Sequence, residues 1–327
     1  MSEHKTHKMH HDNTNHQTVP PTVLDLESGS RPEDWHRHRH GGGWIFHTAR
    51  VAPTAFVAPS AVVCGRAQVL DYAQVLDHAR VAGTACVRDH ARVAGNAEVR
   101  DHAEVRDHAV VEGVAVKIGG KARIGGQARV ADHARVSDSA EVFGRARVFS
   151  SAQVFGRARV FGRAWCGGHT EVFGSAQVFG VAGISDYAKV FGRARVAGNA
   201  RVAVGAFVAG RARIAGHAEV SGDVWVGGRA QVLDAAWVGG NAVAVDNAQI
   251  FGCAKVHGNA VICGNARVCG EAEVLDSAKV CEDAVIAGKA EVCGRARVFG
   301  RALIYGDAWV AGDAKIGGTD RLCRRSA

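Results

Sequence analysis

Apolar and polar residues recur along most of this chain with a fixed period of six. From Ala122 to Ala314, with few exceptions, each six-residue unit begins with Ala, has Val or Ile at its third position and carries Gly or Asp at its fifth. In an extended Ala-x-Val segment the first and third side chains face one side, and the middle side chain faces the other. Gly, and to a lesser degree Asp, tolerates the left-handed backbone of a sharp corner. Each unit is therefore predicted to be a short strand followed by a corner.

Three such units close a triangle, and successive triangles stack as parallel strands roughly 4.8 Å apart. The repeat predicts about 15 coils, and hence a rod of roughly 70 Å. Val or Ile and Ala fill the interior, with Cys166 or Ala244 replacing Val, and Thr170 or Val224 replacing Ala, in single units. Because this interior leaves no room for a ligand, any function is expected on the outer faces, at the ends or between subunits. The predicted fold class is all-β, a single-stranded parallel β-helix.

The spacing of aliphatic and small residues resembles the hexapeptide repeat of bacterial transferases. Val148 with Ala152, and Val196 with Ala200, fit that motif, and the resemblance covers about residues 45–318. It implies left-handed coiling and an acetyltransferase-like activity that would use acetyl-CoA or another acyl-CoA. In those enzymes a loop or C-terminal domain covers a cleft between subunits, and a His activates the acceptor. This chain has no excursion longer than one residue within its repeats, so a non-catalytic role is the leading hypothesis.

The chain divides into three segments by composition. Residues 1–42 are polar and rich in His and Pro, which predicts a disordered tail. Residues 43–318 form the β-helix, and residues 319–327 are predicted to be a short basic tail. The one slip in the period, a step of seven between Ala115 and Ala122, is placed at Val116-Lys117-Ile118. An inserted residue there is expected to turn Lys117 outward.

Charge and cysteine content narrow the possible partners and location. The formal net charge is +8, mostly from Arg spread along the repeats, which favours solubility and weak attraction to anions. No nucleic-acid-binding motif accompanies it, so no specific nucleic acid is predicted as a partner. The N-terminus lacks the apolar run of a signal peptide, and no segment reaches membrane-spanning length. A cytoplasmic protein without a membrane partner is expected, and the neighbouring Cys263 and Cys281 are expected to be free thiols.

Two His residues are the candidates for catalysis. His90 and His108 lie eighteen residues apart, hence on one corner in adjacent coils, where they would share a proton or a metal. The alternative is that both are solvated corner residues. Because no third ligand or orienting carboxylate is evident, no metal site is predicted, and a cofactor is predicted only if the chain is an acyltransferase.

One column of outward residues departs from the charged pattern. Phe207, Trp225, Val243 and Val261 recur at a spacing of eighteen and would stack into an apolar strip. Exposed contiguous apolar area, especially with aromatic side chains, is typical of contact surfaces. The strip predicts a homo-oligomer, a dimer or a trimer.

Phe and Arg form further columns. Phe143, Phe161 and Phe179, and likewise Phe155, Phe173 and Phe191, are predicted to be corner ladders that stiffen the rod. A third set of residues, all Arg at corners or strand centres, is expected to be solvated and partly paired with Glu: Arg157, Arg159, Arg193, Arg195, Arg211 and Arg213.

Three hypotheses for function follow from these patterns. The first is a structural or scaffold rod that acts through self-association or partner binding. The second is the acyltransferase, and the third is an end-to-end polymer of cytoskeletal type. Pro53 and Pro59 would hinder stacking at the N-terminal end, whereas only charge protects the C-terminal end.

Overall fold

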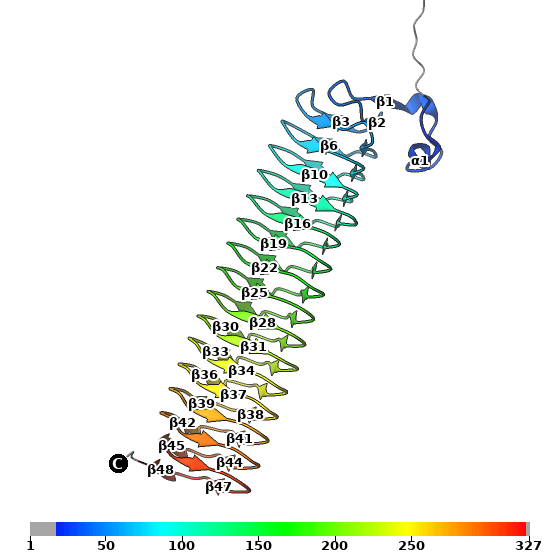
Figure 1. Ribbon diagram of the computed structural model, residues 1–327. Coiled ribbons are helices and arrows are strands. Elements are labelled where there is room, and N and C mark those ends of the chain that lie inside the picture. Colours follow the sequence, from blue (N-terminus) through cyan, green and yellow to red (C-terminus); the bar gives the residue numbers. More distant parts are fainter. Residues whose placement is uncertain (1–17, 325–327) are drawn as a thin grey trace, which may run out of the picture.

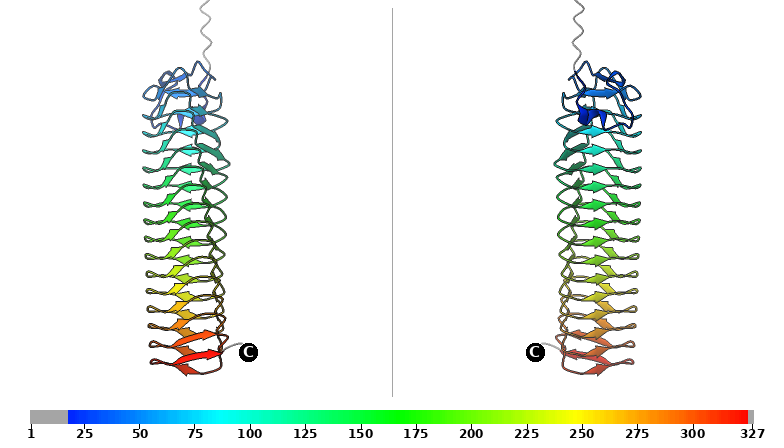
Figure 2. Two further views of the ribbon diagram at one scale, coloured as in Figure 1. Left: turned by 90° about the vertical axis from the view of Figure 1, so that its left-hand side faces the viewer. Right: turned by 90° about the vertical axis from the view of Figure 1, so that its right-hand side faces the viewer.

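The computed structural model describes residues 18–324 and has the form of a straight three-sided rod (Figure 1). Parallel strands stack across the rod axis like rungs along its whole length (Figure 2). They form sheets of 17, 16 and 15 strands, here named face A, face B and face C. The predicted all-β parallel β-helix is confirmed, with about 16 turns.

The strand positions follow the six-residue period. Along the chain, successive strands belong to faces A, B and C in turn. Each strand pairs in parallel with the strands one coil away. From β3 (Arg50–Val51) to β13 (Val110–Gly113), and from β14 (Lys117–Ile118) to β47 (Lys315–Ile316), a strand begins every sixth residue. Most strands contain two residues, and the longer ones in this part are β10 (Arg92–Gly95), β13, β16 (Arg129–Ala131), β28 (Arg201–Ala203), β31 (Glu219–Ser221) and β45 (Leu303–Gly306).

The interior is a single apolar core of Ala and Val or Ile. These side chains are almost all 0% exposed over the whole rod, as the alternation predicts. Cys166 and Ala244 are equally buried at Val positions. Burial raises the pKa of the Cys166 thiol to about 12, so it stays protonated at neutral pH and acts as a small apolar residue.

Gly and Asp recur at the corners because the backbone there has a positive φ, which both residues tolerate. Asp accounts for 11 of the 14 non-glycine residues with positive φ, and an Asp carboxylate often accepts the backbone N–H of the corner one coil below. Asp138 Oδ2, for example, accepts the N–H of Gly156 at 2.9 Å. Asp thus tolerates the left-handed backbone and also satisfies a donor that Gly leaves to solvent.

The extra residue that interrupts the period lies in the corner before the predicted position, not in the strand itself. Lys117 does face outward and Ile118 is buried, but Val116 is also buried, in the position that Ala takes elsewhere. Gly95 pairs with Gly113, whereas Glu98 pairs with Lys117, so the extra residue lies between Gly113 and Val116. A corner accommodates an insertion without shifting any inward side chain, which explains its position.

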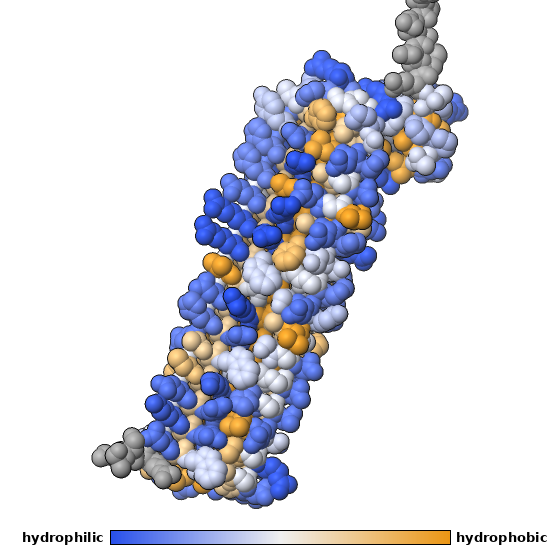
Figure 3. Space-filling model, in the orientation of Figure 1, coloured by the Kyte–Doolittle hydropathy of each residue, from blue (hydrophilic) through white to orange (hydrophobic). Residues whose placement is uncertain are grey.

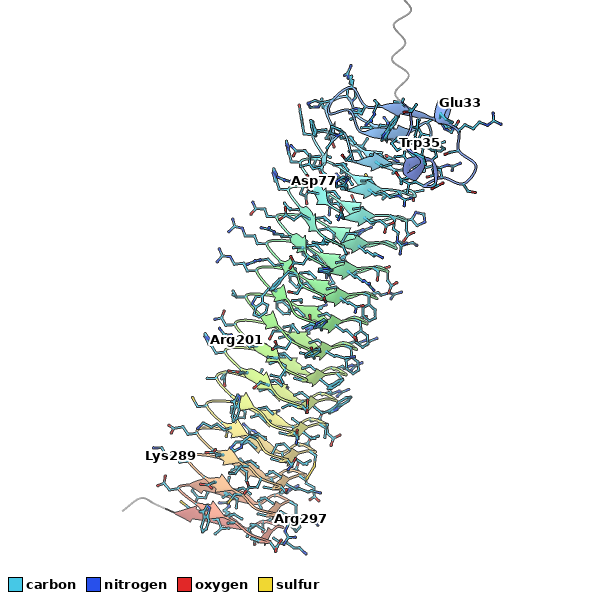
Figure 4. All side chains as sticks on the ribbon, turned by 45° about the vertical axis from the view of Figure 1, so that its right-hand side comes forward. Glu33, Trp35, Asp77, Arg201, Lys289 and Arg297 are labelled. Atoms are coloured by element: carbon cyan, nitrogen blue, oxygen red, sulfur yellow. A yellow bond between two sulfur atoms is a disulfide. The ribbon has the colours of Figure 1, made fainter. Side chains whose placement is uncertain are left out.

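The prediction that all of residues 1–42 are disordered is wrong for residues 18–42, and residues 1–17 lie outside the described part. A short helix α1 (Pro21–Leu24), a 3-10 turn (Pro32–Asp34) and β1 (Trp35–Arg37) precede the coils, and β1 pairs antiparallel with β2 (Trp44–Phe46). This N-terminal extension packs on the upper end of face A (Figures 1 and 4). The buried side chains of the contact are Val19, Val23, Trp35, Trp44, Val62, Cys64 and Ala82.

The extension is ordered because face A itself is apolar at that end. Trp44 and Val62 are outward strand residues, yet they are only 4% and 8% exposed. Burial under the extension raises the pKa of the Cys64 thiol to about 11. A few scattered apolar residues in a polar segment were enough to anchor it, because the folded coils supply the rest of the apolar surface.

The predicted basic tail at the C-terminus is also wrong in part. Residues Arg321–Arg324 form β48, which pairs in parallel with β45 on face B. The segment lacks the Ala-x-Val phrase, but the exposed edge of β45 provides the partner that its backbone needs. Residues 325–327 lie outside the described part.

Thr170 is the one interior residue whose polar atom has no partner among residues 18–324. Its side chain is 0% exposed, and no hydrogen-bond partner contacts Oγ1. Val224 is accepted at the equivalent position of another unit, so we expect Thr170→Val to fit and to stabilise the protein by about 1 kcal/mol. Urea or thermal unfolding would measure the difference.

Thr84→Val is the control for this substitution. The exposed Thr84 hydroxyl donates to the Asp101 carbonyl at 2.8 Å, so its removal should not stabilise the protein. A Thr170→Val variant no more stable than the parent would show that the buried hydroxyl does not lower the free energy of unfolding.

Candidate interaction surface

The four residues of the predicted strip are stacked in register on face A. Phe207 of β29 (Phe207–Val208) pairs with Trp225 of β32 (Trp225–Val226), followed by Val243 of β35 (Val243–Ala244) and Val261 of β38 (Val261–Ile262). The Phe207 and Trp225 rings are stacked with centroids 5.8 Å apart. Trp225 is 40% exposed, and the other three are partly exposed. The prediction of one continuous apolar column is thus confirmed as geometry, whereas its role as an interface is untested.

A second apolar column runs beside the strip along the corner between faces A and B. The Phe191 ring meets Trp225 edge-on, with centroids 6.2 Å apart, which joins the two columns. The predicted Phe ladder lies in this column, since Phe155, Phe173 and Phe191 stack at 4.9 and 5.0 Å. The column continues at the same spacing with smaller residues and ends in an exposed ring: Ala209, Gly227, Val245, Cys263, Cys281 and Phe299. These two columns together are called the apolar band.

The strip and the Phe ladder lie at different positions of the repeat. They nevertheless belong to one face, because the residue two positions after a strand centre lies on the same side as that centre. The Phe143–Phe161–Phe179 ladder, with centroids 5.1 and 5.0 Å apart, lies instead at the corner between faces B and C.

Cys263 and Cys281 form a disulfide within the apolar band, which contradicts the prediction of two free thiols. They occupy the same corner in adjacent coils, where the Cα atoms are only 4.6 Å apart. That distance lies within the range that a disulfide spans. The expected reducing compartment favoured free thiols, whereas stacking at one corner places the two sulfur atoms within bonding reach.

Charged residues border the strip at both ends. Lys189 precedes Phe207 in the column, and its Nζ lies 3.1 Å from Glu171 Oε2. Lys279 follows Val261, and Arg297, which projects from the lower part of the rod (Figure 4), follows Lys279. An apolar centre with a charged border is the usual composition of a protein contact surface.

Face C carries no comparable strip. Trp165 and Trp237 lie in its central column, but Gly183, Arg201 and Glu219 separate them. On the side of the rod seen in Figure 3, hydrophilic side chains line both edges, and more apolar side chains lie between them.

His90 and His108 are brought together as predicted, but as stacked rings. Their centroids are 5.1 Å apart, and Tyr72 stacks on His90 at 5.3 Å, so the corner carries a ladder of three rings. Within residues 18–324, no carboxylate hydrogen-bonds to either imidazole. The neighbouring Asp89 carboxylate instead accepts the N–H of Asp107 at 3.0 Å. The arrangement lacks the group that would orient a catalytic base.

The surface hollows are open and are lined by both polar and apolar side chains. A hollow of about 520 Å³ lies where Gly119 and Ser137 replace larger corner residues, with Arg100, Lys117 and Arg135 around it. Across the described range, no three His, Cys, Asp or Glu side chains converge in a way that would hold a metal ion. No helix in residues 18–324 is both long and apolar enough to cross a membrane.

The two ends of the rod differ. At the N-terminal end, residues 38–43 cover the first strand of face C: the N–H of Val57 donates to the His40 carbonyl and the N–H of Gly43 to the Val57 carbonyl. At the C-terminal end, Ile316 is partly exposed and Leu322 is 38% exposed. Simple head-to-tail stacking would therefore have to displace the N-terminal cover.

Comparison with known proteins gives no further identification. No family model matches the chain, and no curated protein matches it by sequence. The fold class is thus established by the structure, whereas the resemblance to hexapeptide-repeat transferases stays a prediction.

Proposed function

We propose that this protein is a non-catalytic structural rod that associates side by side with a second copy through the apolar band. The observation that carries the proposal is the contrast between two apolar stretches of face A. At the N-terminal end the chain's own extension reduces Val62 to 8% exposure, whereas Trp225, at the same position in its coil, is 40% exposed. An equivalent apolar surface lower on the rod has no cover among residues 18–324, and a second copy would supply one.

The borders of the band favour two rods of opposite direction. Consider a two-fold axis that lies between the two A faces, perpendicular to the rods, at the level between Trp225 and Val243. It would place Phe207 opposite the partner's Val261 and Trp225 opposite the partner's Val243. The same register sets Glu171 opposite the partner's Arg297. Arg297 has no ion-pair partner within its own described chain, so the contact would pair a free charge. The same register also sets Lys189 opposite the partner's Lys279. The repulsion between these two charges is weakened because Lys189 already pairs with Glu171.

Mass measurement with a charge exchange tests this arrangement. Sedimentation at micromolar concentration should give twice the monomer mass of 34.3 kDa for the parent chain. Arg297→Glu, which sets two carboxylates opposite each other, should weaken the dimer several-fold, and adding Glu171→Arg should restore it. A monomeric parent at all concentrations would refute self-association. A parent dimer with no rescue in the double variant would refute only the antiparallel register.

The acyltransferase alternative has less geometric support. The described residues place no carboxylate on His90 or His108, and no loop covers a cleft beside them. The end-to-end polymer has the exposed C-terminal coil in its favour and the covered N-terminal coil against it. Neither alternative is supported by a surface as extensive as the apolar band.

A further inference from the structure

Face B has a stretch whose charge is entirely positive. The parts of face B and its two corners that fall between residues 142 and 233 contain no Asp or Glu, and the acidic residues of that interval lie on faces A and C or at the corner between them. Seven Arg residues of that interval lie at the centre of face B or at its corner with face A, and all are exposed. The six other than Arg159 are Arg157, Arg193, Arg195, Arg211, Arg213 and Arg229. They are called the Arg track.

The Arg track lacks ion pairs, unlike the Arg residues of the rod that lie next to a Glu. Arg159, beside it, lies 2.9 Å from Glu141, and Arg123 and Arg129 also have Glu partners. Within residues 18–324, none of the six track residues has a carboxylate within ion-pair distance. The set that was predicted to be solvated and partly paired with Glu is exposed throughout, and Arg159 is its one member with a Glu partner among residues 18–324.

The reason lies in the composition of the columns. The centre of face B reads Arg159, Gln177, Arg195, Arg213 and Gln231 in successive coils, so the neighbours of the Arg residues are Gln or Arg. The corner column places Arg193, Arg211 and Arg229 in three consecutive coils. The backbones of one column are roughly 4.8 Å apart, and the two columns are roughly 7 Å apart because they are two residue steps apart along the chain. Such closely spaced like charges are unfavourable unless an anion offsets them.

The shape of the Arg track restricts the partner. It runs straight along the rod for four coil steps, roughly 19 Å, and is only two columns wide. Guanidinium groups bind phosphate in a fork geometry, and a linear polymer with a phosphate in each unit would contact several of them at once. Gln177 and Gln231 supply amide hydrogen-bond groups within the track, and the partly exposed Phe161 and Phe179 lie beside it. A basic line beside aromatic rings is typical of surfaces for single-stranded nucleic acid.

A bilayer fits this surface less well. Ala197 and Ala215, the apolar residues beside the adjacent Arg195 and Arg213, are too short to enter a lipid phase. The neighbouring Phe161 and Phe179 rings are stacked on one another and only partly exposed.

We infer that the Arg track binds the phosphodiester backbone of a single nucleic-acid strand without reading its sequence. Its central column lies on face B, and its corner column adjoins the apolar band. A bound strand would therefore run along the rod beside the proposed contact between two copies.

Anisotropy of a fluorescent oligothymidylate with the full chain tests the inference. The test variant is Arg195→Gln/Arg211→Gln/Arg213→Gln. Gln already occupies the column of Arg195 and Arg213 in neighbouring coils, and Arg211 is an exposed corner residue, so the fold should accept the three changes. The control is Arg123→Gln/Arg129→Gln/Arg295→Gln, which removes the same charge from Arg residues that already have acidic partners.

We expect the test variant to bind at least tenfold more weakly than the parent at 50 mM salt, and the control to stay within about threefold. The slope of log K against log salt should become less negative by about 2 in the test variant, since each phosphate contact on a single strand contributes about 0.7. Equal weakening in both variants would reduce the effect to net charge and overturn the inference. Absence of binding by the parent, or binding to vesicles of anionic lipid but not to the oligonucleotide, would also overturn it.

Discussion

Trp225→Glu is expected to convert the associated protein into a monomer of 34.3 kDa. Trp225 lies near the middle of the apolar band, where it contacts Phe207 and Phe191 and is itself 40% exposed. In the proposed contact its ring would be covered by the second copy, and a carboxylate there would be buried without a partner. Loss of the ring together with the uncompensated charge should weaken association by at least 3 kcal/mol, or more than a hundredfold.

The rod offers a matched control for this change. Trp309 occupies the same outward strand position in β46 (Trp309–Val310) on face C, is 65% exposed, and follows Glu291 in its column rather than an aromatic residue. Trp309→Glu should leave the mass unchanged in light scattering. If both variants keep the mass of the parent, the apolar band is not the contact. If both lose it, the effect is one of general destabilisation.

The core and the corners could be predicted from the sequence because their contacts are local in the repeat. An inward Val meets residues one strand away or one coil away, and both sets lie at fixed offsets in the chain. The same rule placed His90 on His108 and Phe207 on Trp225. What the period cannot supply is the side chain's second partner, which depends on the neighbouring column.

The sequence predicts less where two columns meet, or where a column meets a segment without the repeat. The Arg–Glu pairing of Arg159 could be read from Glu141 in the preceding coil, and the absence of pairs at Arg195 and Arg213 could be read from the Gln residues around them. The N-terminal extension gave a weaker signal, because Val19, Val23 and Trp35 have no period. The coils themselves indicate that something covers them, because the outward residues Trp44 and Val62 make the first coils of face A apolar. An apolar outward column is therefore evidence of a cover, whether from the same chain or from another.

Replacement of one corner glycine should have the largest effect on stability. Gly192 has φ +71°, and a Cβ atom there would lie 2.9 Å from the backbone nitrogen of Gly210 in the next coil. Gly192→Ala combines the penalty of the left-handed region with this close approach to backbone that the stacked coil holds in place. We expect it to lower the free energy of unfolding by about 2 kcal/mol.

Gly192→Asp carries the same Cβ and separates the two effects. In the same corner column, Asp138 and Asp246 already have positive φ, and their carboxylates accept the N–H of Gly156 at 2.9 Å and of Gly264 at 3.0 Å. An Asp at position 192 should accept the Gly210 N–H in the same way and recover about 1 kcal/mol of the loss. Thermal unfolding followed by circular dichroism should therefore rank the parent first, the Asp variant second and the Ala variant last. Equal stability of the two variants would show that the carboxylate bond contributes nothing, and an Ala variant as stable as the parent would remove the steric reason for glycine at this corner.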